Sequence, residues 1–153
     1  MQTHDLVNAS LSAFAETMRT GGIASGLSFL NARVQHRCTG VYQLEGINIR
    51  SVYLYDRKGE LLPESLGSVP LNESFCEHAL RDGMFLTSDS SLDERVNGSL
   101  MKGVVIAYCG IPLLDRSGTL FGSLCHFDYV PRTLPSDEFA FLQEAANKMA
   151  PFL

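Results

Sequence analysis

The spacing of apolar residues along the chain is helical at first and then becomes strand-like. Between Leu6 and Met18 apolar residues recur every three or four positions, which predicts a helix with a broad apolar face. The Gly21-Gly22 pair is expected to end this helix. A second helix is expected from Ser25 to Val34, because its leucines fall on one stripe. The chain is therefore predicted to open with two helices.

A period of two follows and predicts an antiparallel hairpin. Val41 to Leu44 reads as one strand, Glu45-Gly46 as the turn, and Ile47 to Asp56 as the partner strand. Pro63 to Pro70 is expected to be a loop. Short hairpins of this kind favour an α+β fold with an antiparallel sheet over a wound parallel sheet.

The second half of the chain predicts a short helix, a further hairpin and a final helix. A helix is expected over Glu73 to Arg81, capped by Asn72 and stopped by Gly83, and a brief strand over Met84 to Thr87. An aperiodic loop follows over Ser88 to Lys102. Two strands are then expected over Val104 to Leu114 and Thr119 to Asp128, and a last helix over Asp137 to Met149. The long polar loop is the expected mobile lid, since loops of this length without periodicity are often functional.

Composition narrows the class of protein. The chain has 153 residues and a formal net charge of −5, with its basic residues scattered, so nothing favours binding to nucleic acid. It shows no signal peptide and no apolar run near the length of about 20 residues that spans a bilayer. A cytoplasmic protein is expected, without membrane contact. The four cysteines lack CxxC spacing and are expected to be reduced thiols: Cys38, Cys76, Cys109 and Cys125.

Five short motifs in order resemble the signature of the GAF domain family. They are Ser74-Phe75-Cys76-Glu77-His78-Ala79-Leu80, Asp89, Tyr108-Cys109-Gly110-Ile111-Pro112-Leu113, the run from Gly118 to Asp128, and Pro131-Arg132. Each is weak alone, and the similarity spans about residues 22–152. The resemblance implies one stand-alone bacterial-type GAF domain over residues 1–153, with residues 1–20 forming an N-terminal helix used for dimerisation.

The resemblance also implies a fold and a binding site. The fold is GAF-like, of the profilin-like or PAS-like α+β type, with a six-stranded antiparallel sheet. The terminal helices cover one face, and a short helix and the long loop enclose a pocket on the other. The ligand-binding residues it implies are Phe75, Cys76, Asp89, Tyr108, Gly110 and Cys125.

Three activities known in the family need residues that this sequence lacks. The Asn-Lys-x-x-x-Phe-x-x-x-Asp-Glu motif of cyclic-nucleotide binders is absent. The region in which bilin-binding members carry a Cys-His pair reads Ser99-Leu100-Met101-Lys102 here. The loop that carries the cysteines of free methionine sulfoxide reductases contains none between Ser88 and Gly103.

Several residues have both a functional and a structural interpretation. Asp89 and Tyr108 could face one pocket and hold a polar ligand, or Asp89 could bind loop amides while Tyr108 forms a wall. Cys76 with His78, and Cys125 with His126, suggest zinc, but residues two apart on a helix diverge and neighbours on a strand face opposite ways. We therefore expect packing rather than a metal site. His126 and Asp128 share a strand face and could orient an imidazole, although a terminal Asp more often caps a turn.

These observations leave three hypotheses of function. The first is a non-enzymatic sensor of a small molecule that signals through a homodimer to another protein. The second is a ligandless dimerisation or interaction module. The third is a thiol-based redox enzyme that uses Cys76, Cys109 or Cys125. No cofactor is firmly implied, and the ligand is not identified by the sequence.

Overall fold

The computed structural model describes residues 3–153, with side chains from Val7 onward, and contains one six-stranded antiparallel sheet. Its strand order is β3-β2-β1-β6-β5-β4. The strands are β1 (Cys38–Glu45), β2 (Asn48–Asp56), β3 (Ser68–Pro70), β4 (Phe85–Thr87), β5 (Ala107–Leu114) and β6 (Leu120–Asp128). The helices are α1 (Thr3–Asn31), α2 (Pro63–Leu66), α3 (Cys76–Asp82) and α4 (Ser136–Met149), with short 3₁₀ turns η1 (Leu71–Glu73), η2 (Ser90–Leu92), η3 (Glu94–Val96) and η4 (Ala150–Phe152).

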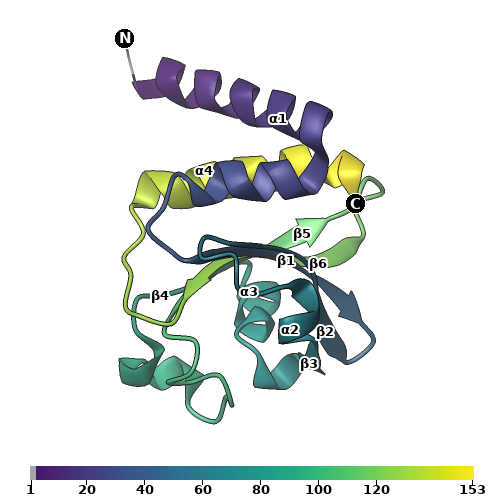
Figure 1. The fold of residues 1–153 in the computed structure, drawn as a ribbon. Helices are drawn as coiled ribbons and strands as arrows, with labels where there is room; N and C mark the ends of the chain where they lie inside the picture. Colours follow the sequence, from purple (N-terminus) through teal and green to yellow (C-terminus); the bar gives the residue numbers. More distant parts are fainter. Residues whose placement is uncertain (1–2) are drawn as a thin grey trace.

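The sheet separates two layers, as predicted. Helices α1 and α4 pack side by side over one face, and α2, α3 and the loop before β5 lie against the other (Figure 1). Each inner strand therefore has one row of side chains in each layer. Leu124 of β6 belongs to the core under α1 and α4, whereas its neighbour Cys125 belongs to the core under α3.

The predicted break in the N-terminal helix is confirmed at Gly22. Its φ of 72° and ψ of −163° interrupt α1, and the two halves fold against each other. The rings of Phe14 and Phe29 meet edge to face at 5.6 Å. Gly26 leaves room for the sulfur of Met18, which a β-carbon there would approach to 2.2 Å. The side chain of Leu6, at the start of the predicted apolar face, lies outside the described side chains.

Both predicted hairpins are present, with a one-residue shift in the first. Glu45 pairs with Asn48, so the loop consists of Gly46 and Ile47 rather than Glu45 and Gly46. Ile47 therefore lies in the turn, where it is 82% exposed, and Ile49 is the first buried residue of β2. In the second hairpin, Asp115 accepts hydrogen bonds from the amides of Ser117 and Thr119, which holds the predicted turn.

Two predictions near the short helix were wrong. The segment from Pro63 to Pro70 is not simply a loop, because it contains α2 and β3, and β3 pairs with the start of β2. Three residues are too few to show a period of two, so the pattern did not reveal this sixth strand. The short helix starts at Cys76, not Glu73, and Asn72 lies in η1 instead of capping it. Gly83 ends the helix in the left-handed conformation, as expected.

Candidate functional site

A cavity of about 240 Å³ lies under the sheet, between β1, β5 and β6 and the segments that cover them. Its floor is formed by strand residues, and its cover by α2, β3, the start of α3 and the segment around Met101 to Val105. The lining residues are Tyr42, Ser65, Leu66, Val69, Ser74, Phe75, Cys76, Met101, Val104, Val105, Tyr108, Phe127 and Tyr129. The cavity is therefore on the face that the sequence predicted, and the end of the long loop helps to cover it.

The wall of this cavity carries no charged side chain. Five of its thirteen residues are aromatic, and only two serines, a cysteine and three phenols bring polar atoms. Beside the wall lies Arg37, whose guanidinium is 5.6 Å from the centre of the Tyr129 ring. That guanidinium is already bound at 2.7 Å to Asp56, which lowers the pKa of the Asp56 carboxyl. The charges at the margin are thus paired with each other.

Tyr108 and Cys76 line the cavity, and Gly110 lies behind Tyr108. Tyr108 and Gly110 share a face of β5, and the phenol ring lies directly over the glycine, since a β-carbon at Gly110 would come within 2.2 Å of the Tyr108 hydroxyl. The Tyr108 hydroxyl donates to the Cys76 sulfur at 3.4 Å, and the Ser123 hydroxyl donates to the same sulfur at 3.2 Å. Gly110 thus matters because its missing side chain lets Tyr108 reach the start of α3.

Two other tyrosine hydroxyls in the wall have no hydrogen-bond partner among the described residues. Within the described residues, the hydroxyls of Tyr42 and Tyr129 make no hydrogen bond, and neither is among the fully enclosed polar atoms that lack a partner. Each hydroxyl therefore reaches open space. Burial raises the pKa of Tyr42 well above its ordinary value, and burial also raises the pKa of Tyr129. Both phenols remain neutral and can donate a hydrogen bond at neutral pH.

The structure brings together some of the residues predicted for the site. Phe75, Cys76 and Tyr108 line the cavity, and Gly110 and Cys125 lie directly behind its wall in the same buried layer. Sequence reasoning missed Tyr42 and Tyr129; the alternation of Tyr42 with buried Val41 was the available signal for the first.

Asp89 lies outside this cavity, and of the two roles considered for it the structure shows the one within its own loop. Its carboxylate caps η2 by accepting the amide of Ser91 at 3.0 Å, which is the alternative role considered for it. It borders a separate open concavity between Leu86 and Arg95. A carboxylate at the end of a short strand binds the nearest free amides, and here these belong to the loop.

The four thiols lie in environments that disfavour the thiolate. All four cysteines are buried and unpaired. Burial raises the pKa of Cys38 and of Cys109 to about 12, and burial raises the pKa of Cys76 and of Cys125 as well. Since the thiolate is the reactive form, burial at these four positions disfavours nucleophilic and redox reactions of the thiols.

The histidine pairs considered from the sequence do not assemble into a metal or catalytic site. His78 stacks on Phe85 at 4.7 Å and points away from Cys76. His126 bonds to Thr39 at 2.7 Å, while Asp128 accepts from Arg132 and from the amide of Arg37. Among the side chains described from Val7 onward, no three His, Cys, Asp or Glu residues are grouped so that they could hold a metal ion.

A buried polar cluster on the helix side of the sheet was not anticipated from the sequence. His36 is fully buried, neither of its ring nitrogens has a partner, and its ring lies 5.8 Å from that of His126. Burial lowers the pKa of His36 to about 4 and the pKa of His126 to about 3. Asn31, at the end of α1, donates to the His36 carbonyl at 2.9 Å. Both imidazoles are neutral at neutral pH and belong to the junction between α1 and the sheet.

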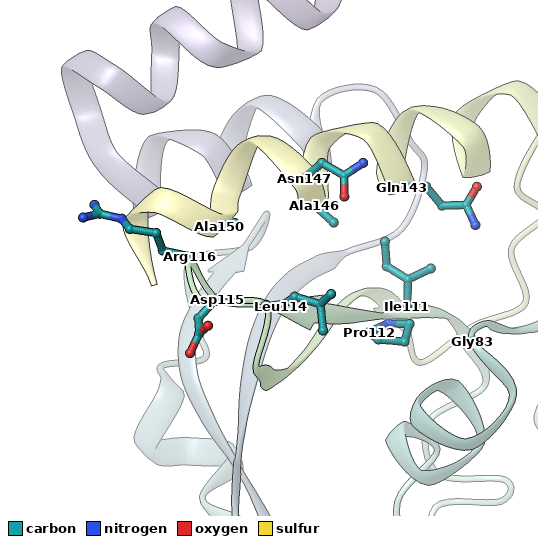
Figure 2. A pocket seen from close by; sticks show the side chains of 11 residues that line it. Gly83, Ile111, Pro112, Leu114, Asp115, Arg116, Gln143, Ala146, Asn147 and Ala150 are labelled. Atoms are coloured by element: carbon teal, nitrogen blue, oxygen red, sulfur yellow. The ribbon is translucent and has the colours of Figure 1, made fainter.

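A second hollow lies on the helix side, at the edge of β5, with a volume of about 440 Å³ (Figure 2). It is bordered by Ile111, Pro112 and Leu114 of β5 and by Gln143 and Asn147 of α4. Both amide side chains are exposed. This hollow is a surface groove beyond the end of β4, which pairs only with Tyr108 to Gly110. This groove is more open to solvent than the cavity under the sheet, so it would surround a bound molecule less completely.

Comparison with known proteins gives a fold. No model of a known protein family matches the sequence, and no curated protein matches it. The GAF domain of a phosphoenolpyruvate-protein phosphotransferase from Acinetobacter superposes with a TM-score of 0.77 at 15% identity, over 98% of this chain and 92% of that one. The phycocyanobilin-bound GAF domain of a cyanobacterial phytochrome gives 0.70 at 15% identity, over 94% and 91%.

Enzymes occur among the similar structures as well. The free methionine-R-sulfoxide reductase of Neisseria meningitidis, solved with its substrate, superposes with a TM-score of 0.72 at 13% identity, over 98% of this chain and 89% of that one. The chain therefore has the GAF fold, and the predicted α+β architecture is confirmed. That fold is shared by regulatory domains and by reductases, so function has to be argued from the cavity.

Proposed function

We propose that residues 1–153 act as one GAF-type sensory domain that binds a small molecule in the cavity under the sheet. The observation that carries this proposal is the aromatic-walled cavity of about 240 Å³ against the central strands. Ligand sites of small-molecule binders are typically concave, mostly apolar and furnished with a few polar groups. The cover includes the edge strand β3 and two short segments outside the sheet, α2 and the end of the loop, which can move without disturbing the sheet.

A bound molecule would report its presence through the sheet to the terminal helices. Tyr108 and Cys125 face the cavity layer, while their neighbours Cys109 and Leu124 pack under α1 and α4. A ligand changes the arrangement of the helices only if it binds one arrangement better than another. We propose that the outer surfaces of α1 and α4 contact a second copy of the chain, and that a signalling protein reads the change.

The proposal is for a binding protein rather than an enzyme. The raised pKa values of all four buried thiols favour this choice over the redox alternative. The reductase similar in fold acts on a free amino acid derivative, which carries an ammonium and a carboxylate. The uncharged wall of this cavity offers neither of these groups an opposite charge.

Native mass spectrometry of the protein as purified tests the proposal. We expect a dimer that carries a discrete additional mass, and loss of that mass in a Val105→Trp variant, whose larger side chain would occupy the cavity. Val130→Trp is the matched control, since Val130 is 45% exposed and is not part of the wall. A dimer without additional mass, unchanged by Val105→Trp, would favour the ligandless interaction module. A monomer would rule out signalling through a dimer.

A further inference from the structure

We infer that the cavity selects an uncharged, ring-sized molecule and holds it through hydrogen bonds from the hydroxyls of Tyr42 and Tyr129. This inference rests on the proposed function and specifies the class of ligand for the same site.

The absence of charge in the wall is the first argument. A carboxylate, phosphate or ammonium placed there would lose its hydration, and none of the thirteen lining residues could compensate its charge. Arg37, beside Tyr129, and Arg95, over Phe85 outside the wall, are both bound to carboxylates. Arg37 binds Asp56 at 2.7 Å, and Arg95 binds Asp93 at 2.6 Å while its guanidinium covers Phe85 at 4.7 Å. A charged molecule would therefore be bound more weakly than a neutral molecule of the same shape.

The size and composition of the cavity are the second argument. A dry cavity of about 150 Å³ lined by Leu, Ile and Phe is large enough to accept benzene. The cavity here, at about 240 Å³, has room for one substituted ring or a small fused ring. Much of the aromatic part of its wall comes from three neighbouring strands, with Tyr42 on β1, Phe127 on β6 and Tyr108 on β5. Rings pack well against such walls in edge-to-face and offset geometries.

The third argument is that some tyrosine hydroxyls of the wall have hydrogen-bond partners and others do not. The Tyr108 hydroxyl is already bound to the Cys76 sulfur, and Ser74 donates to the Leu71 carbonyl at 2.8 Å. Only Tyr42 and Tyr129 line the cavity with hydroxyls that have no partner in the described part of the chain. A ligand that carries a carbonyl, amide or hydroxyl group can accept these hydrogen bonds. The recognised molecule therefore combines an apolar ring with at least one neutral polar group.

The test compares three near-isosteric probes that differ in charge: benzamide, benzoate and benzamidinium. Each is titrated at pH 7.5 into ¹⁵N-labelled full chain, and binding is followed by the amide shifts of residues that line the cavity. We expect benzamide to shift these amides at concentrations at least about tenfold below those needed for either charged probe. Binding of benzoate or benzamidinium as tight as that of benzamide would overturn the inference, while small-molecule binding as such would stand.

Substitution of the phenols tests the hydrogen bonds. The Tyr42→Phe and Tyr129→Phe variants keep the rings, and each should weaken benzamide binding about threefold to tenfold. Tyr53→Phe is the matched control, because Tyr53 lies on β2, is 40% exposed and is outside the cavity. Benzamide binding that is unchanged in the Tyr42→Phe, Tyr129→Phe double variant would overturn the assigned role of the hydroxyls.

The remaining outcomes separate the inference from the proposed function. If no probe binds but a molecule is retained in native mass spectrometry, its charge decides: a neutral molecule supports the inference and a charged one overturns it. If no probe binds and no molecule is retained, both the inference and the proposed function fail.

Discussion

Gly122 is the position at which the structure predicts the largest effect of adding one methyl group. It lies on the central strand β6 opposite Gln43 of β1, at the last pair of the β1–β6 ladder. A β-carbon there would come within 1.8 Å of the Tyr42 carbonyl oxygen, 2.8 Å of its carbonyl carbon and 3.0 Å of the Gln43 α-carbon. All three atoms belong to the main chain, so no side-chain rotation relieves the overlap. The strands themselves must separate.

The magnitude of the effect follows from that separation. Moving the shortest contact from 1.8 Å to 3.0 Å requires a displacement of 1.2 Å, which would lengthen ordinary ladder hydrogen bonds beyond bonding distance. Losing two or three such bonds, in a region where water cannot replace them, costs about 3–6 kcal/mol. That is a large part of the total free energy of unfolding of about 5–15 kcal/mol that is typical of natural domains.

The assay is urea unfolding of the Gly122→Ala variant followed by far-ultraviolet circular dichroism. Gly46→Ala is the matched control, because Gly46 has a φ of 63° and no atom within 4 Å of the added carbon. Its loss should be limited to the backbone strain of about 1–2 kcal/mol. If Gly122→Ala lowers the free energy of unfolding no more than Gly46→Ala, the steric reasoning is refuted.

Three further predictions follow. The Gly110→Ala variant should displace the Tyr108 ring, lower the free energy of unfolding by about 1–3 kcal/mol and reduce benzamide binding in the same titration; unchanged binding would contradict the described packing. His36 and His126 have folded-state pKa values of about 4 and about 3, below the ordinary histidine value of about 6.5. Because the unfolded chain therefore binds more protons in acid than the folded chain, the free energy of unfolding should fall as the pH drops below about 6.5. Urea titrations should show a loss of about 2–3 kcal/mol per pH unit between pH 6 and 4, halved in a His36→Leu variant, whereas a flat profile would contradict two buried neutral imidazoles. The native thiols, Cys76 among them, should react with an aromatic disulfide reagent only as fast as the protein opens, and one rapidly reacting thiol at pH 7 would revive the redox hypothesis.

The sequence predicted a protein without membrane contact, and the helices of the structure can be compared with that prediction. Within the described chain, no helix is long and apolar enough to cross a membrane.

The sequence by itself determined the order and type of the longer elements, because their apolar residues are spaced by the geometry of the helix and the strand. The break at Gly22, the turn at Gly118 and the helix over residues 137–149 depend only on neighbouring residues, and all three agree with the structure. The GAF-like architecture could be predicted because its motifs occur in order. Local patterns of this kind can be recognised in the sequence without knowledge of the tertiary structure.

The tertiary structure decided which of these residues meet. The three-residue strand β3 exists because it pairs with β2, which no local pattern records. The sequence allowed Asp89 and Tyr108 to face one pocket, but the Asp89 carboxylate accepts a hydrogen bond from the amide of Ser91 in its own loop. Tyr42 and Tyr129 are far apart in sequence and come to one cavity only through the pairing of β1 with β6. Contacts between distant segments depend on strand register and on which face each side chain takes, and these are properties of the assembled sheet.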